Sequence, residues 1–383
     1  MGKNNWNTKK LYELGTFDKG AGISKEDILP QGLPCIRYAE IYTKYDFQAK
    51  EFSSYISAET AKTSKPITQG TLLFAGSGET AEDIGKSVAY MGNSIAYASG
   101  DTILFKFHNS KENVLFYSYY LNTIGRKQLN KLGAGQSIVH IYSKELAKVE
   151  VPCPSAAEQR KIVEVLETWD KAIGLTKQLI EQKELQKKYL MQQLLTGRTR
   201  LKGFTDKWEN VRLKQLCSIQ KGQQLNANTL TKNGKYACLN GGIIPSGYTT
   251  KWNTEANTIS ISEGGNSCGY VNWNDSRFWA GGHCYTLTNV KISTSFLYFV
   301  LKNKEGPIMN LRVGSGLPNI QRPSLEKLLL KIPSTQKEQQ AIANVLSSCD
   351  KGIDLLKQKL AKLEEQKKGL MQVLLTGKVR LVK

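Results

Sequence analysis

Several groups that enzymes use for catalysis are scarce or missing in this sequence. Three histidines occur among 383 residues, and neither a Walker phosphate-binding loop nor a His-Glu-x-x-His zinc motif is present. No two prolines are adjacent, which excludes the Asn/Asp-Pro-Pro-aromatic motif of adenine methyltransferases. We therefore expect no catalytic residues in this chain.

Long apolar runs are missing as well. No stretch of 18 or more apolar residues occurs and the first residues are polar, so we expect neither a membrane span nor a signal peptide. The seven cysteines include no Cys-x-x-Cys pair, which indicates reduced thiols in the cytoplasm. Cys268 with His283-Cys284 lacks the spacing of a structural zinc site, so we predict no bound metal.

Acidic residues are outnumbered, and the net charge is +20. The excess is +3 in residues 1–151, +4 in 152–203, +8 in 204–332 and +5 in 333–383. Because the charge is spread along the chain, it favours a long polyanion lying across a folded surface over a disordered basic arm. A generically basic protein without a nucleic-acid partner is the alternative.

The chain contains a long internal repeat. Residues 158–203 and 338–383 align without a gap at an offset of 180, and 24 of these 46 positions are identical. The pattern Trp-x4-Leu-x2-Leu-x4-Lys-Gly begins at Trp6 and again at Trp208. The interiors between these flanks share little sequence. Repeated flanks around unlike interiors indicate a common frame that holds two different modules.

Each repeat predicts one long helix. Ser155 with Glu158, and Thr335 with Glu338, fit the capping box at a helix start, and each repeat ends in Leu-Leu-Thr-Gly, a helix stop. Apolar residues alternate at spacings of four and three, which is typical of a coiled-coil seam. The predicted seam residues are Ile162, Leu166, Trp169, Ile173, Ile180, Leu190, Leu194, Ile342, Leu346, Ile353, Leu356, Leu360, Leu370 and Leu374.

Such a seam needs a partner, and the simplest partner is the duplicate helix in the same chain. We expect the two helices to pack antiparallel, with one module at each end. The polar seam residues Thr176, Lys183 and Lys187 are expected to fix the register. Homodimerisation through either helix is the alternative.

The two interiors are predicted to be mixed α/β. Aromatic and β-branched runs predict strands at 71–74, 102–107, 258–261 and 284–287, and helices are expected at 114–122 and 295–303. Glycine-rich loops follow equivalent strands at 76–80 and 262–267. Glycine allows a backbone to approach a DNA groove closely, and a simple tight turn is the equal alternative.

Side chains that suit bases and phosphates occur in both modules. The predicted DNA contacts are Arg37, Tyr38, Lys44, Ser77, Lys86 and Arg126 in the first module, and Asn240, Tyr248, Lys251, Asn266 and Arg277 in the second.

Taken together, the repeated opening, the Leu-Met-Gln-x-Leu-Leu-Thr-Gly terminus and the Pro-x4-Glu-Gln approach to the second helix resemble a specificity subunit of a type I restriction–modification system. The resemblance covers essentially the whole chain. It implies an α+β architecture: two mixed α/β target recognition domains, joined by two long antiparallel coiled-coil helices with internal pseudo-two-fold symmetry. The corresponding segments are 1–151 and 204–332 for recognition, and 152–203 and 333–383 for the helices.

The same resemblance implies a function. A specificity subunit is a non-catalytic reader of double-stranded DNA that recognises a bipartite site, with one half per domain. Its helices dock two modification (methyltransferase) subunits, and restriction (translocase/endonuclease) subunits join them. S-adenosylmethionine, ATP and Mg²⁺ are then expected on the partner subunits, with none bound by this chain. A subunit with its own DNA-modifying or DNA-cleaving activity, and a coiled-coil protein scaffold, are the alternatives.

Overall fold

The computed structural model describes residues 6–80, 82–135, 139–314, 316 and 318–382. It forms two compact units. Unit 1 comprises Met1–Leu175 and Leu360–Lys383, and unit 2 comprises Thr176–Lys359. Each unit therefore combines one module with part of both long helices, and the four segments expected from the sequence stay a prediction.

Unit 1 is built on a five-stranded sheet in the order β2-β11-β7-β9-β4, antiparallel except for the parallel pair β9 and β4. A second sheet has the order β5-β3-β10-β6, and the pairs β1-β13 and β8-β12 complete the unit. The strands are β1 Asn7–Lys10, β2 Gly15–Lys19, β3 Leu33–Ile36, β4 Gln48–Ala49, β5 Tyr55–Ile56, β6 Lys65–Ile67, β7 Thr71–Ala75, β8 Ser77–Gly78, β9 Ser87–Tyr90, β10 Ala96–Ala98, β11 Thr102–Phe107, β12 Val139–His140 and β13 Glu150–Cys153. The short helices are α1 Leu11–Leu14, α2 Tyr38–Thr43, α3 Ala58–Thr63, α4 Val114–Asn122, α5 Arg126–Leu129 and α6 Ser143–Leu146.

Unit 2 repeats this plan with fewer strands. Its main sheet is β15-β21-β18-β19, its second sheet is β17-β16-β20, and β14 pairs with β22. The strands are β14 Trp208–Arg212, β15 Ser218–Lys221, β16 Tyr236–Leu239, β17 Gly247–Thr249, β18 Thr258–Ser262, β19 Val271–Asn274, β20 Trp279–Ala280, β21 Cys284–Thr288 and β22 Leu329–Pro333. The helices are α8 Leu213–Leu216, the 3-10 turn Ala227–Thr229, α9 Thr294–Asn303, α10 Glu305–Met309 and α11 Arg322–Glu326.

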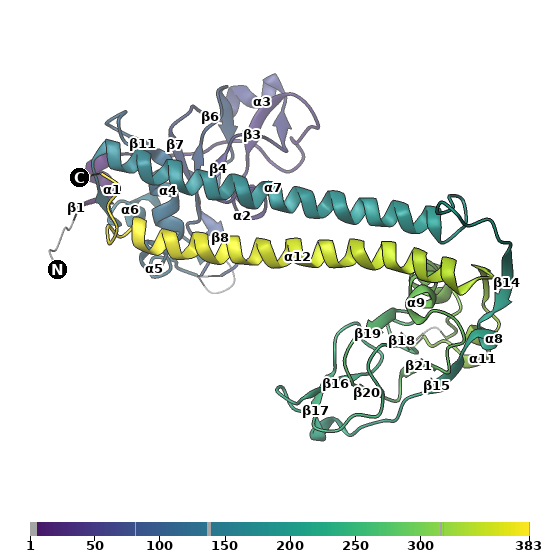
Figure 1. Ribbon diagram of the computed structural model, residues 1–383. Helices are drawn as coiled ribbons and strands as arrows, with labels where there is room; N and C mark the ends of the chain where they lie inside the picture. The colour runs from purple at the N-terminus through teal and green to yellow at the C-terminus, as the bar shows by residue number, and fades with distance from the viewer. Residues whose placement is uncertain (1–5, 81, 136–138, 315, 317, 383) are drawn as a thin grey trace. The chain divides into compact units, whose positions relative to one another are not determined.

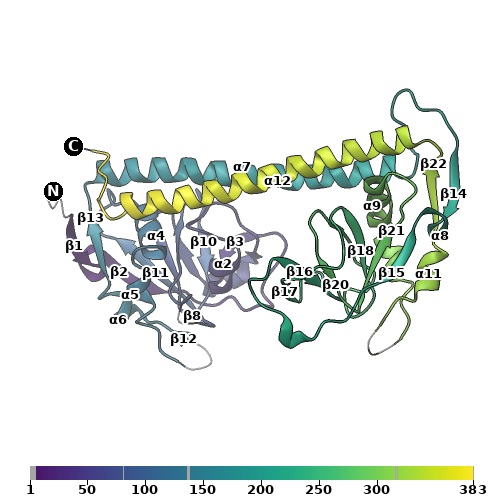
Figure 2. The same cartoon turned by 60° about the horizontal axis from the view of Figure 1, so that its bottom comes forward.

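The strands and helices expected in both interiors are confirmed. The predicted strands are β7, β11, β18 and β21, and in each module the two predicted strands are neighbours in the main sheet. The predicted interior helices are α4 and α9, which lie between the main sheet and the long helices (Figure 2). In each unit, an apolar core therefore joins the main sheet, the interior helix and the adjacent ends of both long helices.

The two long helices are α7, Ala156–Leu194, and α12, Gln336–Leu374, each of 39 residues (Figure 1). They end as expected: the glycines Gly197 and Gly377 have φ of 71° and 69°, the left-handed conformation that stops a helix. Their starts differ from the capping-box prediction. Ser155 Oγ accepts the Glu158 N–H at 3.3 Å, but the carboxylates of Glu158 and Glu338 point to arginines instead of back to the cap.

Those carboxylates form reciprocal ion pairs. Arg200, after α7, binds Glu338 at the start of α12 through two nitrogens at 2.6 and 2.7 Å. Arg380, after α12, binds Glu158 at the start of α7 with one contact of 2.5 Å. Each pair lies within one unit, and in each the end of one helix meets the start of the other. The helices are therefore antiparallel in both units.

A second reciprocal pair lies farther along the seam. Lys187 pairs with Asp350 in unit 2, and Lys367 pairs with Asp170 in unit 1. Since 187 and 367, and 170 and 350, are equivalent positions of the repeat, one contact is made twice. Lys187 and the buried Thr176 lie in the seam as expected, but Lys183 is exposed and bonds Gln186, so its predicted role in the register is wrong.

Most predicted seam residues face the interior. The buried ones are Ile162, Leu166, Ile173, Ile180, Leu194, Ile342, Leu346, Ile353 and Leu374. The half-buried ones are Trp169, Leu190, Leu356, Leu360 and Leu370. Burial is strongest near the helix ends, where the modules pack.

We predict that Glu158→Gln destabilises the chain by about 2 kcal/mol, because it leaves Arg380 without a charged partner beside a fully buried side chain. The estimate lies below that for a fully buried pair because the Arg380 side chain is 31% exposed. The measurement is the free energy of unfolding from urea titration. Glu164→Gln is the matched control: its exposed pair with Lys161 in the same helix is worth less than about 0.5 kcal/mol. Equal losses from both variants would contradict the role of the buried pair.

Candidate nucleic-acid interface

The glycine-rich loops occupy equivalent places in the two modules. In unit 1, Ser77 follows β7 and pairs with His140. In unit 2, Gly264 follows β18 and forms a β-bridge with Asn319. Both loops thus lie at the same end of the main sheet, and one strand, β11 or β21, separates each from the strand that carries the repeated lysine, Lys19 or Lys221. A shared frame places two different sets of polar side chains at this end.

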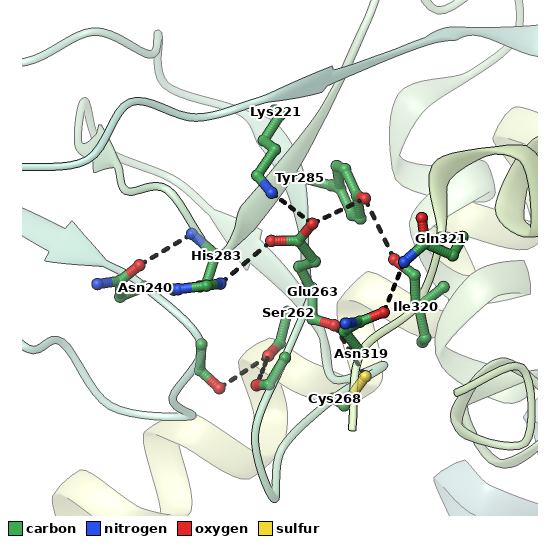
Figure 3. A network of polar contacts seen from close by, with 12 residues as sticks. Lys221, Asn240, Ser262, Glu263, Cys268, His283, Tyr285, Asn319, Ile320 and Gln321 are labelled. Atoms are coloured by element: carbon green, nitrogen blue, oxygen red, sulfur yellow. Dashed lines mark hydrogen bonds and ion pairs between the residues drawn. The ribbon is translucent and has the colours of Figure 1, made fainter. Parts of the chain in front are cut away.

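In unit 2 these side chains converge on Glu263 (Figure 3). Lys221 Nζ lies 2.6 Å from Glu263 Oε1, and His283 Nδ1 lies 3.2 Å from Oε2. The Tyr285 hydroxyl lies 3.1 Å from Oε1, and burial followed by the Glu263 charge raises the pKa of Tyr285 to about 12. Cys268 Sγ donates to the Glu263 carbonyl at 2.9 Å. The carboxylate is therefore fixed by several donors from different strands.

The equivalent place in unit 1 holds a smaller set of groups. Ser77 Oγ lies 3.0 Å from His140 Nδ1, and the Tyr42 hydroxyl donates to the Ser77 carbonyl at 3.0 Å. Ser77 and His140, with Lys19 and Asp101, line a pocket of about 240 Å³. Ser77 itself is buried and its hydroxyl contacts His140, and its contact with DNA stays a prediction.

Lys86 and Arg126 lie together, and both side chains donate hydrogen bonds to backbone carbonyls of the protein. Both line one pocket, and burial lowers the pKa of each. Lys86 Nζ donates to the Tyr45 carbonyl at 2.7 Å. Arg126 Nε donates to the Glu82 carbonyl at 2.9 Å, and its guanidinium also bonds the Ile84 carbonyl. Their geometry gives both side chains a structural role, and DNA contact by them stays a prediction.

The remaining candidates of unit 1 lie around α2. Arg37 precedes the helix and is paired with Glu40 at 3.7 Å, and Tyr38 is the half-buried first residue of the helix. Lys44 follows the helix end and is exposed. Of these three, Lys44 is the one whose charge is presented fully to solvent.

The candidates of unit 2 are mostly exposed. Lys251 and Asn266 are exposed, and Tyr248 on β17 is 38% exposed. Arg277 lies 4.3 Å from the Trp252 ring and pairs with Glu255 at 2.8 Å. Asn240 is half-buried, and its Oδ1 accepts the His283 N–H at 3.0 Å. Asn240 is thus the candidate that the structure brings into contact with the Glu263 cluster.

The sequence prediction did not include Glu263, His283 or Lys221 as site residues. A signal for two of them was present, because Lys221 belongs to the repeated Lys-Gly and Glu263 lies in the glycine-rich loop. His283 was considered only as a zinc ligand. Its actual partner is the Glu263 carboxylate, 20 residues away in the glycine-rich loop.

The comparisons with known proteins agree with this architecture. The model of the type I restriction modification DNA specificity domain matches residues 3–185 and again residues 205–365. The chain belongs to this family. Each of the two matched segments contains one module and most of the long helix that follows it. The internal duplication is therefore a duplication of the family domain.

Two curated relatives illustrate the range of the specificity family. A provisionally named type I specificity subunit of Mycoplasma genitalium is 37% identical over 152 residues, 39% of this chain and 39% of that relative. The specificity subunit of the type I restriction enzyme MjaVIII of Methanocaldococcus jannaschii is 26% identical over 302 residues, 70% of each chain. The match thus spans about two fifths of the length of the Mycoplasma relative.

Solved structures confirm the fold. The crystal structure of a type I restriction–modification S subunit from M. genitalium has a TM-score of 0.68 with this chain at 19% identity, covering 98% of this chain and 97% of that one. A chain from a study of complex assembly and conformational transition of the type I R-M system has a TM-score of 0.60 at 15% identity. Within the described part of the chain, no helix combines the length and apolar character required to cross a membrane.

We predict that Lys251→Gln and Lys86→Gln separate phosphate contact from structural support. The exposed Lys251 is expected to neutralise a DNA phosphate, so its loss lowers DNA affinity and reduces by about 1 the slope of log affinity against log salt. Lys86→Gln keeps that slope and lowers the melting temperature, because two backbone carbonyls lose their donor. A salt slope that falls with Lys86→Gln and not with Lys251→Gln would reverse these assignments.

Proposed function

We propose that this chain is the DNA-recognition subunit of a type I restriction–modification complex and reads a bipartite site, one half with each module. The observation that carries the proposal is that the two halves share the same long-helix contacts but have different polar groups at the same end of the main sheet. The reciprocal pairs of Glu158 and Glu338 repeat the frame, whereas Ser77-His140 stands where unit 2 has the Glu263 cluster. Identical frames with different reading groups suit a site made of two different halves.

The chain acts in this proposal as a reader without catalysis of its own. The net charge of +20 supports binding of a polyanion, and residues 204–332 carry the largest share. Exposed cations position the DNA backbone, and polar groups at the sheet end specify the base sequence. S-adenosylmethionine, ATP and Mg²⁺ belong to the partner subunits in this scheme, and the complex works in the cytoplasm.

The helices offer a matched pair of docking positions for two modification subunits. Leu175 in unit 1 and Leu355 in unit 2 are equivalent residues of the repeat, and both are exposed, by 56% and 65%. A large exposed apolar side chain on a helix is suited to a protein partner. Because the two leucines occupy equivalent positions, two copies of one partner find the same anchor. Restriction subunits complete the complex through their contacts with this assembly.

The test of the proposed function is selection of bound duplexes from a random DNA pool by this chain co-purified with its modification subunit. We expect a split motif, with two short defined blocks around an undefined gap of fixed length. A single continuous block would contradict reading by two modules. Binding that merely follows the salt concentration, without any motif, would favour the scaffold alternative.

We predict that Leu175→Glu and Leu355→Glu each remove one of two bound modification subunits, because a buried charge at the anchor opposes docking. The mass of the purified complex, measured by light scattering, reports the stoichiometry. Leu185→Glu is the control: Leu185 is 60% exposed on the same helix, but its equivalent in the second repeat is Glu365. A complex that keeps both partners in the first two variants would exclude the leucines as anchors.

A further inference from the structure

The Glu263 cluster combines a buried acceptor with exposed donors. The Glu263 side chain is 9% exposed, while those of Lys221 and His283 are 52% and 63% exposed. A buried carboxylate is costly unless it is paired and hydrogen-bonded, so Glu263 fixes the positions of the groups that compensate it. The solvent-facing edges of Lys221 and His283 are therefore held in place by a partner beneath them.

The hydrogen-bond polarity of these edges follows from the contacts. A carboxylate only accepts, so His283 donates its Nδ1–H to Glu263, and in the tautomer with one ring proton Nε2 is then an acceptor. Lys221 gives one N–H to Glu263 and retains two. Asn240 Oδ1 accepts a hydrogen bond from the backbone N–H of His283. The side-chain amide nitrogen of Asn240 has no acceptor among the described residues. The cluster thus offers two donors and one acceptor.

The position of Asn240 is limited by a neighbouring glycine. The Gly281 N–H donates to the Leu239 carbonyl at 2.8 Å, so this glycine lies against the strand end that carries Asn240. A Cβ atom at Gly281 would approach Asn240 Oδ1 to 2.8 Å. Only glycine therefore leaves room for the observed Asn240 orientation.

We propose that Lys221, Asn240 and His283, positioned by Glu263, form the centre with which the second module reads one G·C base pair in the major groove. Guanine presents two acceptors there, N7 and O6, and cytosine presents one donor, N4. Lys221 and Asn240 donate to guanine, and His283 Nε2 accepts from cytosine. This assignment rests on the proposed function and names the chemistry of one of its half-sites.

The first module supports a reading role for this end of the sheet. Lys19, the equivalent of Lys221, lines a pocket there together with Ser77 and His140, which have a different pattern of donors and acceptors. The lysine is common to both modules, and the groups around it differ. A purely structural ion pair at a repeated frame position would be expected to recur, and the Glu263 pair does not.

The experiment repeats the random-pool selection with His283→Ala, Asn240→Ala and Glu263→Gln, each in complex with the modification subunit. We expect the wild-type motif to contain a G·C pair in one block, and the variants to lose preference at that position by about tenfold. The other block stays unchanged. Asn310→Ala is the control, because Asn310 is an exposed amide residue at the end of α10 in the same module and lies outside the cluster. The melting temperature of each variant separates loss of reading from loss of folding.

The outcomes are distinguishable. His283→Ala and Asn240→Ala alter side chains that reach the surface, so they remain informative even if Glu263→Gln fails to fold. A split motif that keeps its G·C preference in both overturns the inference and leaves the proposed function intact. Affinity that falls equally for all sequences assigns the cluster to phosphate and also overturns it. A wild-type complex that selects no split motif overturns the proposed function and this inference together.

Discussion

The structure depends on two fully buried carboxylates, Glu158 and Glu338, that are each compensated by an arginine from the other repeat. Removing a partner from a buried charge costs several kcal/mol, so the core of each module is stabilised by the end of the opposite helix, which supplies the arginine. The tryptophan that opens each module reinforces this contact. Trp6 and Trp208 lie 5.5 and 5.8 Å from Arg380 and Arg200, within the range of a cation–π interaction. The same tryptophan–arginine contact is therefore made in both units.

A frame fixed in this way leaves the module interiors free to differ. Gln159 and Gln339 show how the join is made: each accepts the N–H of the residue before the interior helix, Asn113 at 2.7 Å or Ser293 at 3.3 Å. Each also donates to a proline carbonyl just before its own helix, at 3.1 or 2.9 Å. Because these bonds involve backbone groups of the module, they place few demands on its side chains. The Glu-Gln pair can therefore be identical in both repeats while the reading groups diverge.

The elements were predictable from the sequence because local signals determine them. The four-three spacing and the Leu-Leu-Thr-Gly stop predicted α7 and α12, and runs of aromatic and β-branched residues bounded by glycines predicted β7 and β18. The polar contacts were not predictable in the same way. A Glu three residues after Ser155 fits a capping box locally, yet an arginine 222 residues away is the stronger partner for its charge. Likewise, Lys86 resembles a surface cation in sequence, and only the fold brings the Tyr45 carbonyl to its ammonium group.

Two cations of the second module, Arg277 and Lys221, differ in how strongly their acidic partners hold them. Arg277 is paired with Glu255 at the surface, where both side chains are about half exposed, and such a pair contributes little to stability. Exchanging that glutamate for a phosphate therefore costs little, which suits backbone contact by Arg277 and its neighbour Lys251. Lys221 is different, since leaving Glu263 would expose a buried carboxylate. In the proposed reading centre, the pair with Glu263 therefore fixes the orientation of the Lys221 ammonium group. Discrimination between base pairs requires donors with a fixed orientation. The proposed reading centre therefore assigns affinity and specificity to separate residues of one module.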